Sequence, residues 1–228
     1  MKIYRVSTYA KPPGGKFQDY AQLSCRKSDE KFLREEHFHG KAFPGKWRPI
    51  TLFFEEPLWP RADFYTFYPE NFVCTERAKT LAGPALEKAG EFLPVTIEGE
   101  SEVHYIYNVT ACGAFIDPPR SIYEYELDEP AETARGVRVA PAFQTKPIAK
   151  LSVFKLSEES GRTIYSVERT GNPSNGEFKA LVEHHRLTGI KFDLAWSEKS
   201  GPVPWRCPPA KDGDFVWKYG DGKKFRPR

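Results

Sequence analysis

Two similar stretches of this chain, 92 positions apart, constrain its fold more than any other feature of the sequence. Residues 74–77 are Cys-Thr-Glu-Arg and residues 166–169 are Ser-Val-Glu-Arg. Each stretch follows a short apolar strand pattern and precedes a helical pattern, which leads through a glycine turn into an aromatic strand. A strand–helix–strand unit that occurs twice indicates a duplication in which each helix covers a sheet. The chain is therefore predicted to be an α+β protein.

Local patterns predict the remaining elements. Gly83-Pro84 is expected to kink or split the first repeated helix, because proline removes a backbone donor and clashes with the preceding turn. A turn over 98–102 is expected to join two strands into a hairpin. Strands are predicted over 2–9, 50–55, 63–68, 72–74, 91–98, 103–109, 121–127, 148–155, 163–167 and 190–196, and helices over 28–37, 75–89 and 174–186. These elements predict one mixed, mostly antiparallel sheet with a few covering helices.

The whole chain, residues 1–228, is predicted to be a single domain. Its 228 residues can bury a sizeable core, and 39% hydrophobic with 29% charged residues is a globular composition, which excludes a disordered chain or a coiled coil. Within this domain we expect an irregular or extra-strand N-terminal region over 1–62 that packs onto the sheet, the repeated core over 63–196, and a Pro- and Gly-rich basic tail over 197–228.

Hydropathy and cysteine usage indicate a cytoplasmic protein without a membrane partner. No run approaches the ~20 consecutive apolar residues that span a bilayer, and Lys2 interrupts any N-terminal signal core. Cysteines that share a structural zinc ion lie two to four residues apart, and none here do, so a zinc ribbon is excluded. We expect reduced thiols and no cofactor. The cysteines are Cys25, Cys74, Cys112 and Cys207.

The sequence lacks the usual signatures of catalysis. It has no nucleophile elbow, no phosphate-binding glycine loop, no dinucleotide fingerprint and no zincin helix. His37 and His39 after two glutamates form the most metal-like cluster, because residues two apart on a strand point the same way. No further ligand is recognisable nearby, which favours a pair of polar loop histidines.

An enzyme stays open as the alternative class. A hydrolase or transferase would use Glu76, Glu168 or His104 in a cleft, where one carboxyl group would have a strongly perturbed pKa. His104 alternates out of phase with Tyr105, so we expect it on the opposite face of its strand.

Charge is distributed unevenly along the chain. A net charge of +3 and a pI of about 8.5 are below what a nucleic-acid binder shows, so no direct nucleic-acid partner is expected. Residues 123–132 are acidic with no base among them, and 218–228 are mainly basic. Each run is either a solvated surface or a docking patch for a partner of opposite charge. We predict partner binding by the acidic segment, defined as Glu124, Glu126, Asp128, Glu129 and Glu132.

Tryptophans occur mostly in proline-rich irregular segments. There they either pin loops to the sheet or form aromatic anchors of an interface, where tryptophan is enriched. The five are Trp47, Trp59, Trp196, Trp205 and Trp217.

The two repeated units also carry a family resemblance. Residues 72–77 with 92–95, residues 107–109 with Asp117 and Ser121, and residues 164–169 with 187–192 resemble the Immunity-MXAN type of bacterial polymorphic-toxin immunity proteins. The resemblance covers roughly residues 63–196. Thr75 stands where the family usually has serine, and the family helix normally lacks an interruption such as Gly83-Pro84.

This resemblance implies binding rather than turnover. Members look like neutralisers of an antibacterial toxin encoded beside them, so the expected partner is a cognate toxin whose active site is covered. No catalytic residue is implied, since the family motif looks architectural. An adaptor that binds secretion machinery without neutralising a toxin, and a homodimer, are further arrangements that the sequence leaves open.

Overall fold

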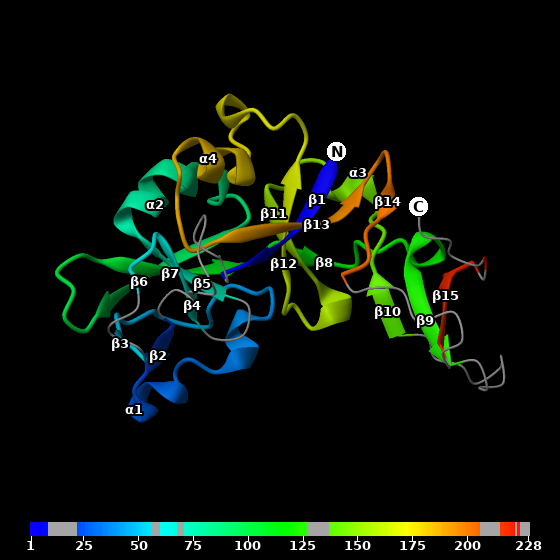
Figure 1. The fold of residues 1–228 in the computed structure, drawn as a ribbon. Coiled ribbons are helices and arrows are strands. Elements are labelled where there is room, and N and C mark those ends of the chain that lie inside the picture. The colour runs from blue at the N-terminus through cyan, green and yellow to red at the C-terminus, as the bar shows by residue number, and fades with distance from the viewer. Residues whose placement is uncertain are drawn as a thin grey trace.

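Strands make up three sheets in the computed structural model, which describes residues 1–8, 22–55, 60–67, 71–126, 137–205, 215–221 and 223 (Figure 1). The first sheet has the order β2-β3-β6-β7-β5-β4, and the second β14-β13-β1-β12-β11-β8. A smaller sheet, β10-β9-β15, lies beside the second (Figure 1). Most neighbouring strands are antiparallel, which confirms the α+β class, although we expected one sheet.

The bounds of the elements are as follows. Strands of the first sheet are β2 (Leu23–Cys25), β3 (Thr51–Phe54), β4 (Phe64–Phe67), β5 (Asn71–Thr75), β6 (Gly90–Ile97) and β7 (His104–Val109). Those of the second are β1 (Lys2–Ser7), β8 (Cys112–Gly113), β11 (Val153–Leu156), β12 (Ile164–Glu168), β13 (Lys191–Ser197) and β14 (Gly201–Pro202). The small sheet has β9 (Ile122–Glu126), β10 (Val137–Ala140) and β15 (Phe215–Tyr219). The α-helices are α1 (Lys27–Glu30), α2 (Glu76–Ala82), α3 (Thr145–Ile148) and α4 (Phe178–His184).

The predicted duplication is present in the topology. β4–β5–α2–β6 and β11–β12–α4–β13 follow the same course, and in each the two strands that flank the helix run parallel with one antiparallel strand between them. In the register of the first sheet, Tyr105 pairs with Cys74 and Pro94. In the second sheet, Tyr4 pairs with Ser166 and Leu194.

The central strands of the two units come from different places in the chain. The first unit is completed by β7, which follows β6 directly, whereas the second is completed by β1 from the start of the chain. The predicted N-terminal strand therefore lies in the middle of a sheet. The basic tail likewise contributes β14 and β15 to sheets.

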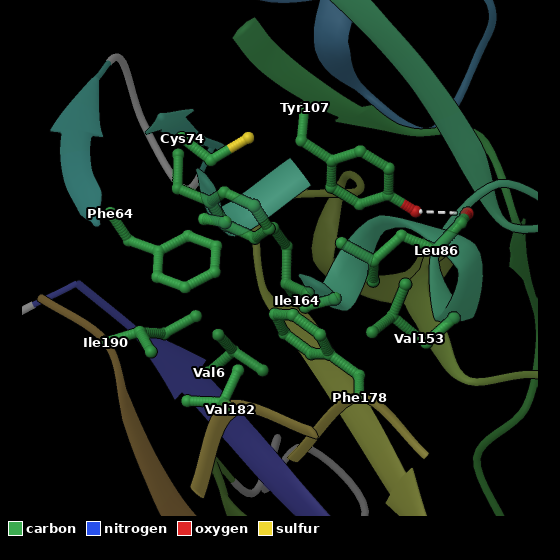
Figure 2. Packing of buried hydrophobic residues seen from close by; sticks show 14 of the residues in the cluster. Val6, Phe64, Cys74, Leu86, Tyr107, Val153, Ile164, Phe178, Val182 and Ile190 are labelled. Atoms are coloured by element: carbon green, nitrogen blue, oxygen red, sulfur yellow. Dashed lines mark hydrogen bonds between the residues drawn. The ribbon is translucent and has the colours of Figure 1, made fainter. Parts of the chain in front are cut away.

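One core is shared by both units. Figure 2 shows Val6 and Ile164 of the second sheet facing Phe64 and Cys74 of the first, and the α4 residue Phe178 is fully buried with them. Small residues on the buried face of α2, Ala78 and Ala82, let its backbone approach the sheet closely. Tyr107 donates a hydrogen bond from Oη to the Leu86 carbonyl oxygen at 2.8 Å, so its buried hydroxyl is satisfied (Figure 2).

Helices differ from their predicted ranges for local reasons. As expected, the Gly83-Pro84 pair ends α2, and a 3₁₀ turn over Gly83–Ala85 follows. The helix over 28–37 is instead α1 and a separate 3₁₀ turn, Glu35–Phe38, because Arg34 takes an extended conformation.

The strand over 148–155 begins only at Val153, since Ile148 ends the helical turn α3 and is buried there. In the second unit, residues 169–177 separate β12 from α4. The buried Glu177 carboxylate accepts hydrogen bonds from the backbone N–H groups of Arg169, Thr170 and Gly171 at 3.1, 3.0 and 2.8 Å, and so fixes this loop.

No helix in the described part of the chain is long and apolar enough to cross a membrane. The three described cysteines, Cys25, Cys74 and Cys112, are free thiols, and burial raises the pKa of Cys74.

Candidate functional site

The arginines of the two repeated motifs hold the fold together. Arg77 donates to Asp63 Oδ1 at 2.7 Å and to the His185 carbonyl oxygen at 3.0 Å. Arg169 donates to the carbonyl oxygens of Ala149 and Leu151, both at 2.6 Å. Each arginine thus fixes the segment that leads into the first strand of its unit, β4 or β11. The Glu-Arg motif has an architectural role in both units.

The glutamates of the motif also occupy equivalent places. Glu76 accepts a hydrogen bond from Tyr105 on β7, and Glu168 accepts one from Tyr4 on β1 at 3.0 Å. Lysines of α2 and α4 cover the same two rings: Lys79 Nζ lies 3.9 Å from the Tyr105 ring centroid and Lys179 Nζ 4.9 Å from that of Tyr4. Phe92 and Phe192 meet the two tyrosines edge-on at 6.3 and 6.5 Å.

Glu168 is unsuited to general acid catalysis. Burial would raise its pKa, but hydrogen bonds from Lys2, Lys179 and Tyr4 outweigh burial and hold the pKa below its ordinary value. Its two carboxylate oxygens lie 3.0 Å from Lys2 Nζ and 3.1 Å from Lys179 Nζ. A carboxylate that is kept ionised by two ammonium groups stabilises structure and has no proton to donate.

The candidate histidines lie apart from these carboxylates. His104 lies on the sheet face opposite Tyr105, as predicted, and its ring centroid is 6.1 Å from that of Tyr65. Burial lowers the pKa of His104. His37 Nδ1 lies 3.1 Å from the Phe32 carbonyl oxygen, and its ring meets Phe43 edge-on. His37 is in a 3₁₀ turn and not a strand, so the spacing argument for His39 as its co-ligand does not apply. The described residues hold no group of three or more His, Cys, Asp or Glu side chains placed to bind a metal.

Part of the predicted acidic segment serves the small sheet. Glu124 on β9 accepts a hydrogen bond from Trp217 Nε1 on β15 at 2.8 Å, and these two residues pair across the strands. Trp217 is buried, so this contact pins the tail to β9. Glu126 ends β9, while Asp128, Glu129 and Glu132 lie outside the described residues. Partner binding by this segment stays a prediction.

A surface hollow of about 360 Å³ is found on the second sheet. Its floor is formed by Arg5 on β1, Tyr165 on β12 and Asp193 on β13, which are neighbours across three adjacent strands. Its rim includes Pro141, just after β10, and residues 203–205, just after β14. The hollow therefore lies between the second sheet and the segments that follow β10 and β14.

Exposed apolar side chains gather at this hollow. Three large hydrophobic residues are exposed among those that the structure describes: Trp205 at 56%, Val103 at 45% and Leu194 at 38%. Trp205 and Leu194 both line the hollow, whereas Val103 lies at the β6–β7 turn of the other sheet. Exposed tryptophan beside arginine is typical of binding hot spots.

The charges of the hollow are only partly paired. Lys191 Nζ lies 2.7 Å from Asp193 Oδ1, an ion pair at the surface. The Arg5 guanidinium lies 6.0 Å from the Trp205 ring centroid, and no carboxylate of the described residues is within ion-pair distance of it. At the floor, the Tyr165 hydroxyl donates to Glu159, which also accepts from Arg138 at 2.7 Å, and burial raises the pKa of Tyr165.

Sequence reasoning identified Trp205 as one candidate anchor but missed the hollow. Arg5 and Asp193 are neighbours only because β1 inserts beside β13, and nothing in the sequence signals that pairing. The other described tryptophans pin structure: Trp196 and Trp217 are buried, and Trp47 donates to the Pro94 carbonyl oxygen at 2.8 Å.

Fold and site together define an α+β protein built from two copies of one β–β–α–β unit, with a hot-spot-like hollow on the second. No family model matches the chain, and comparison with curated proteins finds no match.

Proposed function

We propose that this chain is an immunity protein, which binds a cognate antibacterial toxin encoded nearby and neutralises it by covering the toxin's active site. The observation that carries the proposal is the hollow on the second sheet, where Trp205 and Leu194 are exposed beside Arg5. Large exposed apolar side chains next to an arginine that makes no ion pair with a described residue favour a protein partner. Burying such side chains releases water, and these residue types dominate the energetics of interfaces.

The placement of the motif residues supports binding over catalysis. Arg77 and Arg169 fix the segments that lead into β4 and β11, and Glu168 is held ionised between two lysines. None of Glu76, Glu168 and His104 lines the described hollow. The three residues that the enzyme alternative would use are thus engaged in the fold or lie away from the hollow, which favours the hollow as a binding surface among the described residues.

Co-expression with the product of the adjacent gene tests this function. We expect the wild-type chain to restore growth and to co-purify with the toxin. Trp205→Ala combined with Leu194→Asp should abolish both effects, while Val103→Asp, which changes an equally exposed apolar residue on the other sheet, should leave both intact. A chain that neither restores growth nor forms a complex would refute the proposal and favour the enzyme.

A further inference from the structure

We infer that the hollow receives an acidic side chain of the bound partner, whose carboxylate pairs with Arg5 while an adjoining apolar side chain packs on Trp205 and Leu194. This inference rests on the proposed function, since it specifies what part of a toxin the hollow contacts. It starts from the position of Arg5, a cation on the central strand of a sheet, at the floor of a concave surface.

Arg5 has the geometry to bind a carboxylate. The guanidinium presents a planar fork of donors that matches two carboxylate oxygens, and it is always charged. Here it makes no ion pair with a described residue, and its main neighbour is the ring of Trp205 at 6.0 Å. An aromatic ring contacts the guanidinium without using its donors, and no carboxylate of the described residues competes with a ligand for them.

The other charges of the hollow support an anionic ligand. Asp193 pairs directly opposite Arg5 in the sheet, yet its Oδ1 lies 2.7 Å from Lys191 Nζ, so the lysine offsets its charge. Among the described residues, two cations and one carboxylate line the hollow, which leaves one positive charge in excess. Tyr165 donates its hydroxyl proton to Glu159 and adds no negative charge, because burial raises its pKa.

The apolar rim determines what kind of anion fits. A free phosphate or a nucleic-acid backbone would add no apolar contact to Trp205 and Leu194, which are exposed at 56% and 38%. A protein segment with an acidic residue beside an aliphatic or aromatic one covers both the charge and the apolar surface. The volume of about 360 Å³ is large enough for two or three side chains.

Charge reversal at Arg5 tests the inference in the complex of the full chain with the toxin. We expect Arg5→Glu to weaken binding at least thirty-fold, Arg5→Lys to weaken it less, and the matched control Arg26→Glu, on the far edge of the first sheet, to change it less than three-fold. Arg5→Gln removes the charge without adding a like charge next to Asp193, and serves if Arg5→Glu does not fold.

A scan of the toxin then locates the partner residue. Each acidic surface residue of the toxin is changed to lysine and tested for growth against the wild-type chain and against Arg5→Glu. We expect one substitution to escape the wild-type chain and to be neutralised by Arg5→Glu. If wild type protects but Arg5→Glu protects equally well, or if no acidic substitution restores recognition, the inference is overturned while the proposed function stands. If wild type gives no protection, the proposed function itself fails.

Discussion

The contact between Asp63 and Thr188 joins the two repeated units, and its removal provides a quantitative test of the fold. The Asp63 side chain is 11% exposed and accepts from Arg77 at 2.7 Å, from the Thr188 backbone N–H at 2.8 Å and from Thr188 Oγ1 at 3.1 Å. A hydrogen bond to a charged group contributes about 1.5–3 kcal/mol. Because the Arg77 side chain is 53% exposed, its ion pair adds at most about 1 kcal/mol.

Asp63→Ala should therefore lower the free energy of unfolding by about 2–3 kcal/mol, since water can reach the exposed Thr188 and recover part of the loss. In a chain of this size that corresponds to a fall in Tm of about 5–10 °C. Chemical denaturation with the matched control Glu98→Ala measures the effect. Glu98 lies 3.5 Å from Arg26, and the two side chains are 62% and 60% exposed. Removal of the Glu98 carboxylate should therefore cost less than about 0.5 kcal/mol.

A double-mutant cycle with Arg77→Ala separates the ion pair from the backbone contact. We expect the two substitutions to be less than additive, because they share one hydrogen bond. Asp63→Ala within about 0.5 kcal/mol of the Glu98 control would contradict the reasoning, since the two units would then be held together without this carboxylate.

Three further predictions concern acid stability, backbone conformation and charge. Glu168→Gln should destabilise the protein near neutral pH, because the native state stabilises the ionised form of Glu168. The difference in unfolding free energy from wild type should shrink as the pH falls below 4.5 and through the lowered pKa of Glu168, and urea titrations at several pH values measure it. Gly189→Ala should lower the Tm several times more than Gly176→Ala does. Both glycines have positive φ, but a Cβ at Gly189 would lie 2.0 Å from the Phe64 carbonyl oxygen, whereas nothing lies within 4 Å of a Cβ at Gly176. Equal falls in Tm would contradict this packing. Glu126→Lys with Asp128→Lys should slow toxin association several-fold in stopped-flow mixing, more at low salt, if the acidic segment steers the partner; an unchanged rate would assign these residues to the solvated surface.

Local sequence patterns predicted much of the fold. The patterns at 91–98 and 103–109 correctly predicted the β6–β7 hairpin. Gly83-Pro84 correctly predicted an interruption of the helix, although α2 ends there at Ala82 and does not continue to residue 89. The Glu-Arg repeat was informative because both copies do the same structural work, which is visible in the contacts of Arg77 and Arg169.

Long-range pairing was beyond the reach of these patterns. Periodicity assigns a residue to one face of a strand, but it does not say which strand lies beside it, so β1 was predicted as a strand without its central place. The hollow depends on that placement, since Arg5 and Asp193 meet only through the β1–β13 register. Glu124 looked like a docking charge in sequence, because its partner Trp217 lies in another run of the chain.

Because β1 lies between β12 and β13, the second sheet can be completed only late in synthesis. The first unit contains all of its strands within a short span, so it can form soon after β7 leaves the ribosome. The second cannot: residues 2–7 wait until residue 197 has emerged, and at about 5–20 residues per second that takes on the order of ten to forty seconds. Until residues 164–168 emerge, β1 has neither of its partner strands, and until residue 197 emerges it still lacks β13. Contacts so distant in sequence are also slow to form.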